Sequence, residues 1–587
     1  MKLSGFLFSI WELKKIAMRN LARHKVKTLL TSAAIMVSVA VYIFLNSWLG
    51  GMQIESRRNI VNYEIGAAKL QTKLYFEKKD EMPSYENYLN WEIYRDALAR
   101  EGYNSAPRFV FAGTLFSSSG SAPILFHGVD PEAEALTMRY IGENERYVDF
   151  GRYVKNNGNF EITLGHLAAE KLKVGIPSRP LRLELETLIA QITDNKADAD
   201  FIRSLYVEAP VEKGLFRYPD IVKAGNERMI LKKEASKTDL GRFWNLAAAA
   251  GRNNVRLSAV IDIKAVPDTI RLHRFDGELM PELKGEDRAI VQSAYEYLDI
   301  MDAYLLVEED EGKLNLVLDA MIRSGFSGAV RHVNQVMDVE VVGVINCPAP
   351  LPNANTAFIP LAVLQDEAGM MLGGAVTELV IRDSRVPDYR LPGASESSAE
   401  ITRALKSGLS AQGLSLPDEL AVYTWADYMV DYLGYETLQT GAPNVIVFLL
   451  LILAFLGISN TILLAIMERT KETGMMRALG MTNGQMIITY MLEAGFIGFI
   501  GSILGIILGC ILNYPMVTYG WDLSSMAATL GSDGSMGFRT TGLFRSVWNI
   551  RVIIGSGIVA TILSSFIAII PTRRALKMHI TDSLRFE

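Results

Sequence analysis

The residues best suited to binding chemistry lie in one short charged stretch between two apolar segments. The stretch runs from Met467 to Thr482 and interleaves charged side chains with glycine and methionine. Charged side chains are costly at the centre of a bilayer, so we expect these residues to lie in water at the membrane surface, within reach of a soluble partner. The expected contact residues are Glu468, Arg469, Lys471, Glu472, Gly474, Met475, Met476, Arg477, Ala478, Leu479 and Gly480.

The sequence offers no set of residues for catalysis. ATP hydrolysis needs a GxxxxGK[ST] loop, and Gly312-Lys313 lacks both the upstream glycine and the following hydroxyl residue. No GxSxG occurs, and the six histidines are too dispersed for HExxH or a local metal pair. We therefore expect no catalytic residue, no metal and no directly bound cofactor, no enzyme activity of the chain's own, and no nucleic-acid partner.

Four apolar stretches of the sequence are long enough to cross a membrane and would hold the charged stretch at its surface. No charged residue occurs from Thr28 to Ile54 or from Thr437 to Met467, and each run exceeds the roughly 20 residues that cross a bilayer. We predict spans at 28–54, 445–467, 486–514 and 552–570. The first is longer than the apolar core of a signal peptide and lacks a clear cleavage site, so we expect it to stay as an anchor.

The flanking charges predict the orientation. Residues 1–27 carry seven Lys/Arg and one Glu, and the segments 468–485 and 571–587 carry net charges of +1 and +2. Since basic segments stay inside, both termini and the 468–485 loop should be cytosolic. Apolar residues recur at helical spacing within 1–27, which favours an amphipathic helix on the inner leaflet over a disordered basic tail.

The long segment 55–444 is the predicted extracytoplasmic domain. Residues 28–467 hold a net charge of −15, so this domain is acidic and water-soluble. Its patterns predict an α+β fold: a turn into a helix over 162–174, strands at 181–185, 339–345 and 375–381, a helix over 361–368, and a capped helix from Ser397 to about Leu409. Residues 180–335 look like an inserted module, and a second outer segment covers 515–551. The fold class is thus an integral membrane protein with four α-helical spans and a large α+β domain between spans one and two.

Small residues form stripes within the apolar stretches. Gly501, Gly505 and Gly509 make overlapping GxxxG motifs, which allow close helix packing within one chain or between two.

The charged stretch, with the order of one span, a large domain and three further spans, closely resembles the permease family that includes MacB, FtsX and the LolC/LolE transmembrane subunits. Supporting pieces are Arg19-Asn20-Leu21-Ala22-Arg23, Gly165-His166-Leu167-Ala168, Val342-Gly343-Val344, Glu493-Ala494 and Pro571-Thr572-Arg573-Arg574-Ala575. The resemblance implies an ABC transporter of the mechanotransmission type, in which two permease chains, the same or related, pair with two cytosolic ATPase subunits that bind ATP and Mg. The stretch 468–482 would then be the coupling helix. The alternative is a plain helical hairpin whose methionines cover the membrane surface.

The resemblance also suggests a cargo. MacB carries its ATPase at the N-terminus, whereas 27 residues precede span one here, which favours a separate ATPase. Trp425-Ala426-Asp427 and the two glycine landmarks, Gly165 and Gly343, look most like the LolC/LolE branch. That branch implies release of lipoproteins from a bacterial inner membrane to a periplasmic carrier, with the large domain in the periplasm. A MacB-like efflux pump and an FtsX-like regulator of a cell-wall hydrolase are the alternatives.

If the cargo is a lipoprotein, apolar residues of spans one and two would line a lateral opening for acyl chains and membrane lipid. These residues are Met36, Ala40, Phe44, Ile452 and Phe455. Ordinary lipid contact is the alternative for the same residues.

Overall fold

The chain folds into two compact units. The computed structural model describes residues 25–138, 147–177, 180–208, 229–232, 234–264, 330–367, 374–385, 398–468, 470–522, 540 and 542–576. The helical unit comprises Met1–Glu55, Val430–Ser524 and Leu543–Glu587, and the sheet unit comprises Ser56–Met429 and Ser525–Gly542. The predicted 1–27 helix lies almost entirely outside the described residues, as does most of the 571–587 tail.

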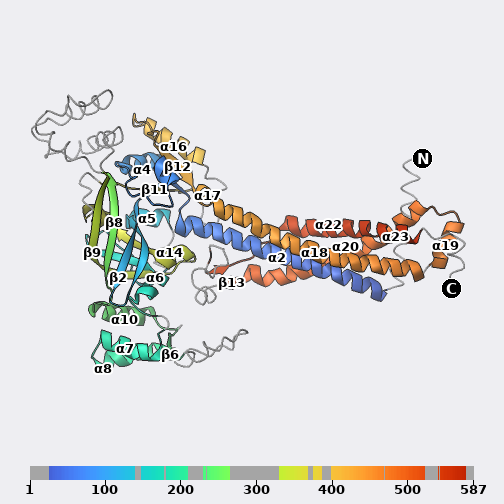
Figure 1. Cartoon of the computed structure of the whole chain (residues 1–587), viewed down its shortest axis with the longest axis horizontal. Coiled ribbons are helices and arrows are strands. Elements are labelled where there is room, and N and C mark those ends of the chain that lie inside the picture. The colour runs from blue at the N-terminus through green and yellow to red at the C-terminus, as the bar shows by residue number, and fades with distance from the viewer. Residues whose placement is uncertain are drawn as a thin grey trace, which may run out of the picture. The chain divides into compact units, whose positions relative to one another are not determined.

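One large sheet organises the sheet unit (Figure 1). Its ten strands in the described part of the chain are β1 (Ala68–Thr72), β2 (Tyr103–Ser117), β3 (Gly120–Val129), β4 (Val148–Gly151), β5 (Glu161–Gly165), β8 (Asn254–Lys264), β9 (Val330–Ile345), β10 (Thr356–Pro360), β11 (Glu378–Asp383) and β12 (Leu420–Thr424). The path runs β12-β1-β11-β2-β3-β10-β5-β9-β4, and β8 pairs with both β2 and β9. The predicted strands at 339–345 and 375–381 are confirmed within β9 and β11, the latter beginning three residues later.

Six of these strands close on themselves. The pairings β2·β3, β3·β10, β10·β5, β5·β9, β9·β8 and β8·β2 return to their start. Cross-strand partners share a face, and Phe111 faces Phe126 with stacked rings 4.9 Å apart, both in the main hydrophobic core. The opposite face of β8 and β9 carries the exposed pair Arg256 and Asp338. A closed ring removes strand edges that would otherwise need covering.

The glycine landmarks lie where two backbones meet. A Cβ on Gly343 in β9 would lie 1.9 Å from the carbonyl oxygen of Arg152, and one on Gly165 would lie 2.0 Å from that of Pro352. No other residue leaves this space open, so glycine at these positions is a packing requirement of the sheet.

Helices cover the sheet and fill the connections. They are η1 (Ile60–Glu64), α3 (Lys73–Glu77), α4 (Trp91–Arg100), α5 (Pro131–Thr137), α6 (His166–Leu172), α14 (Pro350–Asn355), α15 (Leu361–Glu367), α16 (Ser398–Ser410) and α17 (Trp425–Tyr428). The turn into a helix at 162–174 and the helices at 361–368 and up to Leu409 are confirmed by β5 with α6, by α15 and by α16. The predicted cap at Ser397 lies outside the described residues.

The inserted region contains more helix than the sequence patterns predict. It holds α7 (Arg182–Ile192), α8 (Lys196–Ser204), the β6 (Tyr206–Glu208) and β7 (Met229–Leu231) pair, and α10 (Lys237–Ala249). The strand predicted at 181–185 is wrong, because these residues begin α7. Buried Leu185, Leu188, Ile189 and Ile192 recur at helical spacing, which outweighs a five-residue alternation. Within 180–335, residues 254–264 and 330–335 belong to the main sheet.

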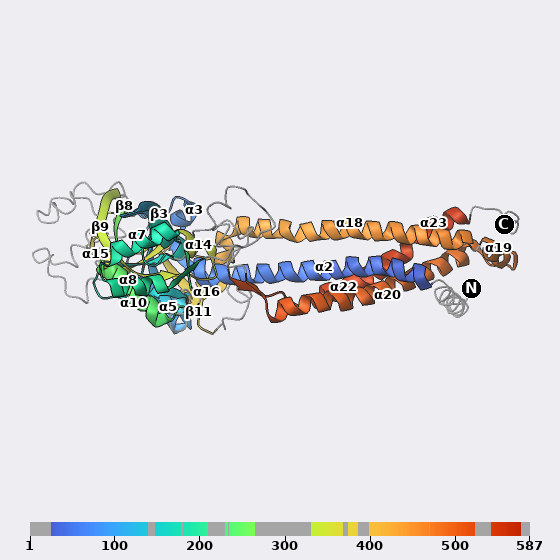
Figure 2. The ribbon, with the colours of Figure 1, turned by 90° about the horizontal axis from the view of Figure 1, so that it is seen from below.

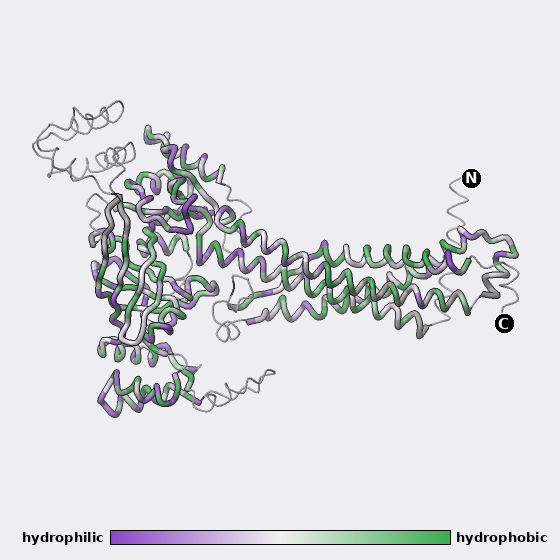
Figure 3. The backbone as a smooth tube through the Cα atoms, in the orientation of Figure 1, coloured by the Kyte–Doolittle hydropathy of each residue, from purple (hydrophilic) through white to green (hydrophobic). Residues whose placement is uncertain are grey.

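Long helices form the helical unit. They are α2 (Lys25–Asn59), α18 (Val430–Glu468), α20 (Asn483–Thr518) and α22 (Ile550–Ile567), joined by the short helices α19 (Thr470–Ala478) and α23 (Ile569–Ala575) and a small pair, β13 (Trp521–Asp522) with β14 (Leu543–Phe544). The long helices lie side by side in both views (Figures 1 and 2). Hydrophobic residues dominate their middle parts (Figure 3).

Three helices in the described part of the chain are long and apolar enough to cross a membrane. They are Thr31–Glu64, Asn483–Thr518 and Ile550–Arg574, and they contain most or all of the predicted spans 28–54, 486–514 and 552–570. The fourth predicted span, 445–467, lies within the 39 residues of α18 and stays a prediction. The three helices indicate a membrane protein with a sheet-rich domain.

The glycine stripe of α20 packs against α2 within one chain. Cβ atoms on Gly501, Gly505 and Gly509 would lie 2.7 Å, 2.8 Å and 3.2 Å from the carbonyl oxygens of Ser32, Met36 and Ala40. The contacts recur every four residues on both helices, as expected for small residues that let helices approach.

Replacing Gly505 with Leu is therefore expected to separate α20 from α2. The added side chain meets backbone rather than a flexible tip, so the helices must shift. The expected result is a lower yield of monodisperse protein in detergent and a lower midpoint of thermal unfolding. Leu508→Ala, which changes a half-buried position outside the stripe, is the control. Equal behaviour of the two variants would contradict the packing account.

Candidate functional site

The sequence after α19 fixes where that helix ends. Gly480 has φ +101°, a conformation that other residues rarely adopt. Its N–H donates to the Arg477 carbonyl at 3.1 Å, and the Met481 N–H donates to the Met476 carbonyl at 3.0 Å. These two bonds form a Schellman motif, in which a left-handed glycine stops the helix and satisfies its last carbonyls. Arg-Ala-Leu-Gly-Met thus dictates a helix end.

The next helix begins two residues later. Thr482 caps α20: its hydroxyl accepts from the Gln485 N–H at 3.3 Å, and the Gln485 side-chain oxygen accepts from the Thr482 N–H at 2.9 Å. This reciprocal capping box sets the start of α20. The stop and the start together hold α19 as a separate short helix at the end of α18 and α20.

α19 has an outward and an inward side. Met475 and Leu479, four residues apart, are 54% and 82% exposed, and Ala478 beside them is exposed. Met476 and Met481 instead pack against the buried cluster of the bundle that includes Met486 and Tyr490. Exposed apolar side chains at i and i+4 form a small face suited to a partner.

The remaining predicted contact residues divide between the two sides. Gly474 is buried, Arg477 is half-buried and Gly480 is exposed. The side chains of Glu468, Arg469, Lys471 and Glu472 lie outside the described residues. The sequence singles out all the methionines, but only the fold separates Met475 from Met476 and Met481.

The residues predicted to line an acyl-chain opening lie on α2 and α18. Ala40 is 1% exposed, and its backbone and that of Met36 lie against the glycines of α20. Phe44 is half-buried on α2, and Ile452 on α18 is 38% exposed. The side chain of Phe455 lies outside the described residues. Met36 and Ala40 thus belong to a helix contact.

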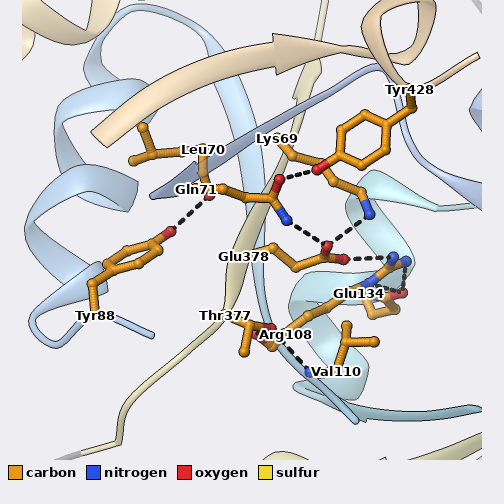
Figure 4. A network of polar contacts seen from close by, with 10 residues as sticks. All are labelled: Lys69, Leu70, Gln71, Tyr88, Arg108, Val110, Glu134, Thr377, Glu378 and Tyr428. Atoms are coloured by element: carbon orange, nitrogen blue, oxygen red, sulfur yellow. Dashed lines mark hydrogen bonds and ion pairs between the residues drawn. The ribbon is translucent and has the colours of Figure 1, made fainter. Parts of the chain in front are cut away.

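A buried network of four charges lies in the sheet unit (Figure 4). The Arg108 guanidinium, fully buried on β2, contacts the Glu134 carboxylate of α5 at 3.1 Å and the Glu378 carboxylate of β11 at 3.3 Å. Lys69 of β1 donates to Glu378 at 2.7 Å, and Gln71 donates to it at 3.1 Å. Two positive and two negative charges balance, which buried charges require.

The network continues to the helix before α18. The Tyr428 hydroxyl, at the end of α17, donates to the Gln71 side-chain oxygen. Burial raises the pKa of Tyr428 well above its ordinary value and lowers the pKa of Lys69, although Glu378 opposes the latter change. Burial, Arg108 and Lys69 together hold the pKa of His127 well below its ordinary value, so this histidine is uncharged at neutral pH. The network ties three strands to α5 and α17.

Sequence reasoning did not find this network. It treats the carboxylates of the domain as a solvated acidic face, whereas Glu134 and Glu378 are buried. The signal available was Arg108 within the otherwise uncharged strand β2, since a lone charge on a buried strand needs a partner. The described residues contain no cluster that could hold a metal.

His166 forms a second charged group at the start of α6. Its Nδ1 lies 3.4 Å from an Asp149 carboxylate oxygen and its Nε2 lies 3.6 Å from one of Glu170. Burial alone would lower the pKa of His166, but the two carboxylates outweigh it and raise the pKa to about 9.

The His166 ion pairs should make stability depend on pH. A raised pKa in the folded state means that the stabilisation is complete below the unfolded value of about 6.5 and is lost as pH rises through about 9. We expect His166→Gln to cost about 1 kcal/mol at pH 6.5, after screening at these partly exposed carboxylates, and little at pH 10. Thermal unfolding of both proteins in detergent at the two pH values measures this. An equal difference at both would contradict it.

Comparison with known proteins finds a similarity for one segment of the helical unit. Residues 444–580, which include α19, α20 and most of α18, match the family model described as FtsX-like permease C-terminal. This segment is therefore similar to an FtsX-like permease domain.

Several curated proteins are similar to part of the chain. The ABC transporter permease YtrF of Bacillus subtilis (strain 168) is 30% identical over 143 residues, which are 23% of this chain and 30% of that protein. An uncharacterized ABC transporter permease of Methanocaldococcus jannaschii is 32% identical over 115 residues, 20% of this chain and 27% of that protein. The macrolide export ATP-binding/permease protein MacB of Agrobacterium fabrum is 28% identical over 203 residues, 33% of this chain and 29% of that protein. The chain thus spans less than a third of the length of each.

Proposed function

We propose that this chain is the permease subunit of an ABC transporter and that α19 transmits the motion of a cytosolic ATPase to the extracytoplasmic domain. One observation carries the proposal: within the FtsX-like segment, α19 is a separate helix with Met475 and Leu479 exposed on one side and Met476 packed on the other. A helix fixed to the bundle on one side can pass on a push received on the other.

The proposed complex has four chains. Two permease chains, identical or related, pair with two ATPase subunits, which bind ATP and Mg, since the sequence has no phosphate-binding loop of its own. In this arrangement the bundle spans a bacterial inner membrane, both termini and α19 face the cytosol, and the sheet unit faces the periplasm.

For the cargo we propose lipoproteins released from the outer leaflet of the inner membrane to a periplasmic carrier. The support is the resemblance of the Trp425-Ala426-Asp427 stretch to the LolC/LolE branch. This stretch forms most of α17, the short helix that precedes α18. Thr424 and Asp427 make a capping box there, with the Asp427 carboxylate accepting from the Thr424 N–H at 2.7 Å.

A second candidate is export of a soluble or amphiphilic compound. It is favoured by the similarity to a protein named macrolide export ATP-binding/permease protein MacB over 203 residues, a longer match than the permease-only relatives above give.

Affinity purification of the tagged chain from its native host, followed by mass spectrometry, tests both. An ABC ATPase with a sibling permease and acylated lipoproteins supports lipoprotein release. An ATPase with an adaptor and an outer-membrane channel supports export, and an ATPase with a cell-wall hydrolase would replace both with a regulatory role. A preparation without any ATPase would overturn the permease proposal itself.

A further inference from the structure

A crevice of about 490 Å³ opens between α2, α18 and α22 in the helical unit. Val39, which lines the crevice, also lies against Gly505 of α20, so the crevice borders the contact between α2 and α20. Ser38, Val39 and Tyr42 contribute from α2, Asn444 and Phe448 from α18, and Arg551, Gly555, Val559 and Leu563 are among its residues on α22. Among the described residues predicted from sequence to line an acyl-chain opening, Met36, Ala40, Phe44 and Ile452 do not line it.

The crevice has a polar and an apolar end. Asn549, just before α22, donates to Asn46 of α2 at 3.3 Å, so the start of α22 is level with the outer part of α2. Tyr42, Asn444 and Arg551 line this end, and Val559 and Leu563 line the other. In the middle the Ser38 and Ser556 hydroxyls donate to carbonyls of their own helices, at 3.0 Å each. The hydroxyls in the middle of the crevice are therefore already hydrogen-bonded, and this part suits an acyl chain.

The length of the crevice fits one leaflet. Arg551 and Leu563 are twelve positions apart on a helix, about 18 Å at 1.5 Å per residue. Half of a bilayer's hydrocarbon core is about 15 Å. Trp548, which is exposed three residues before Arg551, suits the membrane interface. A molecule with its polar end at Arg551 would extend its tail to about the bilayer centre.

The charge at the polar end selects the occupant. Arg551 is exposed, and among the residues that the structure describes no carboxylate pairs with it. Guanidinium groups bind phosphate through paired hydrogen bonds. An acyl chain gains little by leaving lipid for an apolar crevice, so the headgroup contact must supply the specificity. We infer that the crevice binds one glycerophospholipid of the outer leaflet, with its phosphate at Arg551 and an acyl chain along α22.

This inference uses the membrane orientation of the proposed function but does not depend on the cargo. A lipoprotein's acylated terminus carries no phosphate, so Arg551 favours a phospholipid over that cargo.

Mass spectrometry of lipids retained by the full chain after exhaustive detergent exchange tests the inference. Gly555→Leu should fill the crevice without a clash on the helix, because no atom lies within 4 Å of a Cβ at this glycine. Gly441→Leu is the matched control, since Gly441 on α18 also has open space around it and does not line the crevice. Arg551→Gln removes the charge, and Arg545→Gln removes a nearby exposed arginine outside the crevice.

The expected result is about one phospholipid per wild-type chain. Arg551→Gln should lower retention about tenfold, the size expected for losing a charge-assisted contact. Gly555→Leu, which fills the crevice, should also lower retention about tenfold. The two controls should retain the lipid. Equal retention in all five proteins would overturn the inference, as would finding only detergent or an acylated protein in the wild type. Probing the same preparations for the ATPase separates this result from the proposed function, because a lost lipid with a retained ATPase concerns the crevice alone.

Discussion

Arg108→Met is expected to destabilise the sheet unit by about 3–5 kcal/mol, the cost of removing one partner from a buried ion pair. Methionine fits the space of the aliphatic stem but removes the guanidinium that contacts the Glu134 and Glu378 carboxylates, and both carboxylates stay buried. Limited proteolysis of the full chain in detergent over a urea series measures the loss, because the sheet unit then opens at lower urea.

Two comparisons isolate the buried charge. Arg256→Met removes an arginine whose ion pair with Asp338 is exposed, and it should leave the urea midpoint unchanged. Adding Glu134→Leu to Arg108→Met should recover part of the loss, since the buried carboxylate that lost the guanidinium is then removed as well. Arg108→Met and Arg256→Met with equal midpoints would show that the network does not hold the unit together.

Leu479→Glu is expected to abolish ATP-driven activity and to lower ATPase copurification at least about tenfold, as loss of a central interface contact does. Leu479 is 82% exposed, so the substitution should leave the bundle intact. Arg477→Glu should act in the same direction, although Arg477 is half-buried and its loss also affects the helix.

Tyr519→Glu provides the matched control. Tyr519 follows the opposite end of α20 and is 74% exposed. The Tyr519→Glu variant should copurify with the ATPase as the wild type does. Normal copurification with Leu479→Glu would contradict the role of the outward face of α19, and a loss in both variants would indicate a general defect of folding.

The helices of the helical unit could largely be predicted from sequence, because the signals that specify them lie close together along the chain. Charge-free runs mark the long helices, and Gly480 and Thr482 mark the junction after α19 through backbone rules that act within a few residues. The GxxxG spacing predicts a tight contact, but the partner helix α2 lies more than 400 residues away along the chain, and no local pattern identifies it.

The sheet unit could be predicted only as a class. Its ring depends on β9 pairing with β8 along its length and with β5 near its end, and such long-range registers have no local signal. The error at 181–185 arises because a five-residue apolar alternation also fits the first turns of α7. Burial of Glu134 and Glu378 follows from the same long-range pairing, so composition alone predicts a solvated surface.

Within the candidate site, the packing of Met476 and Met481 against the bundle could not be predicted from sequence either. Three methionines of similar chemistry lie within seven residues, and the Schellman motif decides which of them packs on the bundle. Met475 and Leu479 remain for a partner.

The most direct test of the account is site-specific photo-crosslinking in the native host, with a photoreactive residue at Met475, at Leu479 or, as control, at Tyr519. The account predicts a crosslink to an ABC ATPase subunit from the first two positions and none from the third. No ATPase crosslink from Met475 or Leu479, or an equal one from Tyr519, would contradict α19 as the site where the ATPase acts.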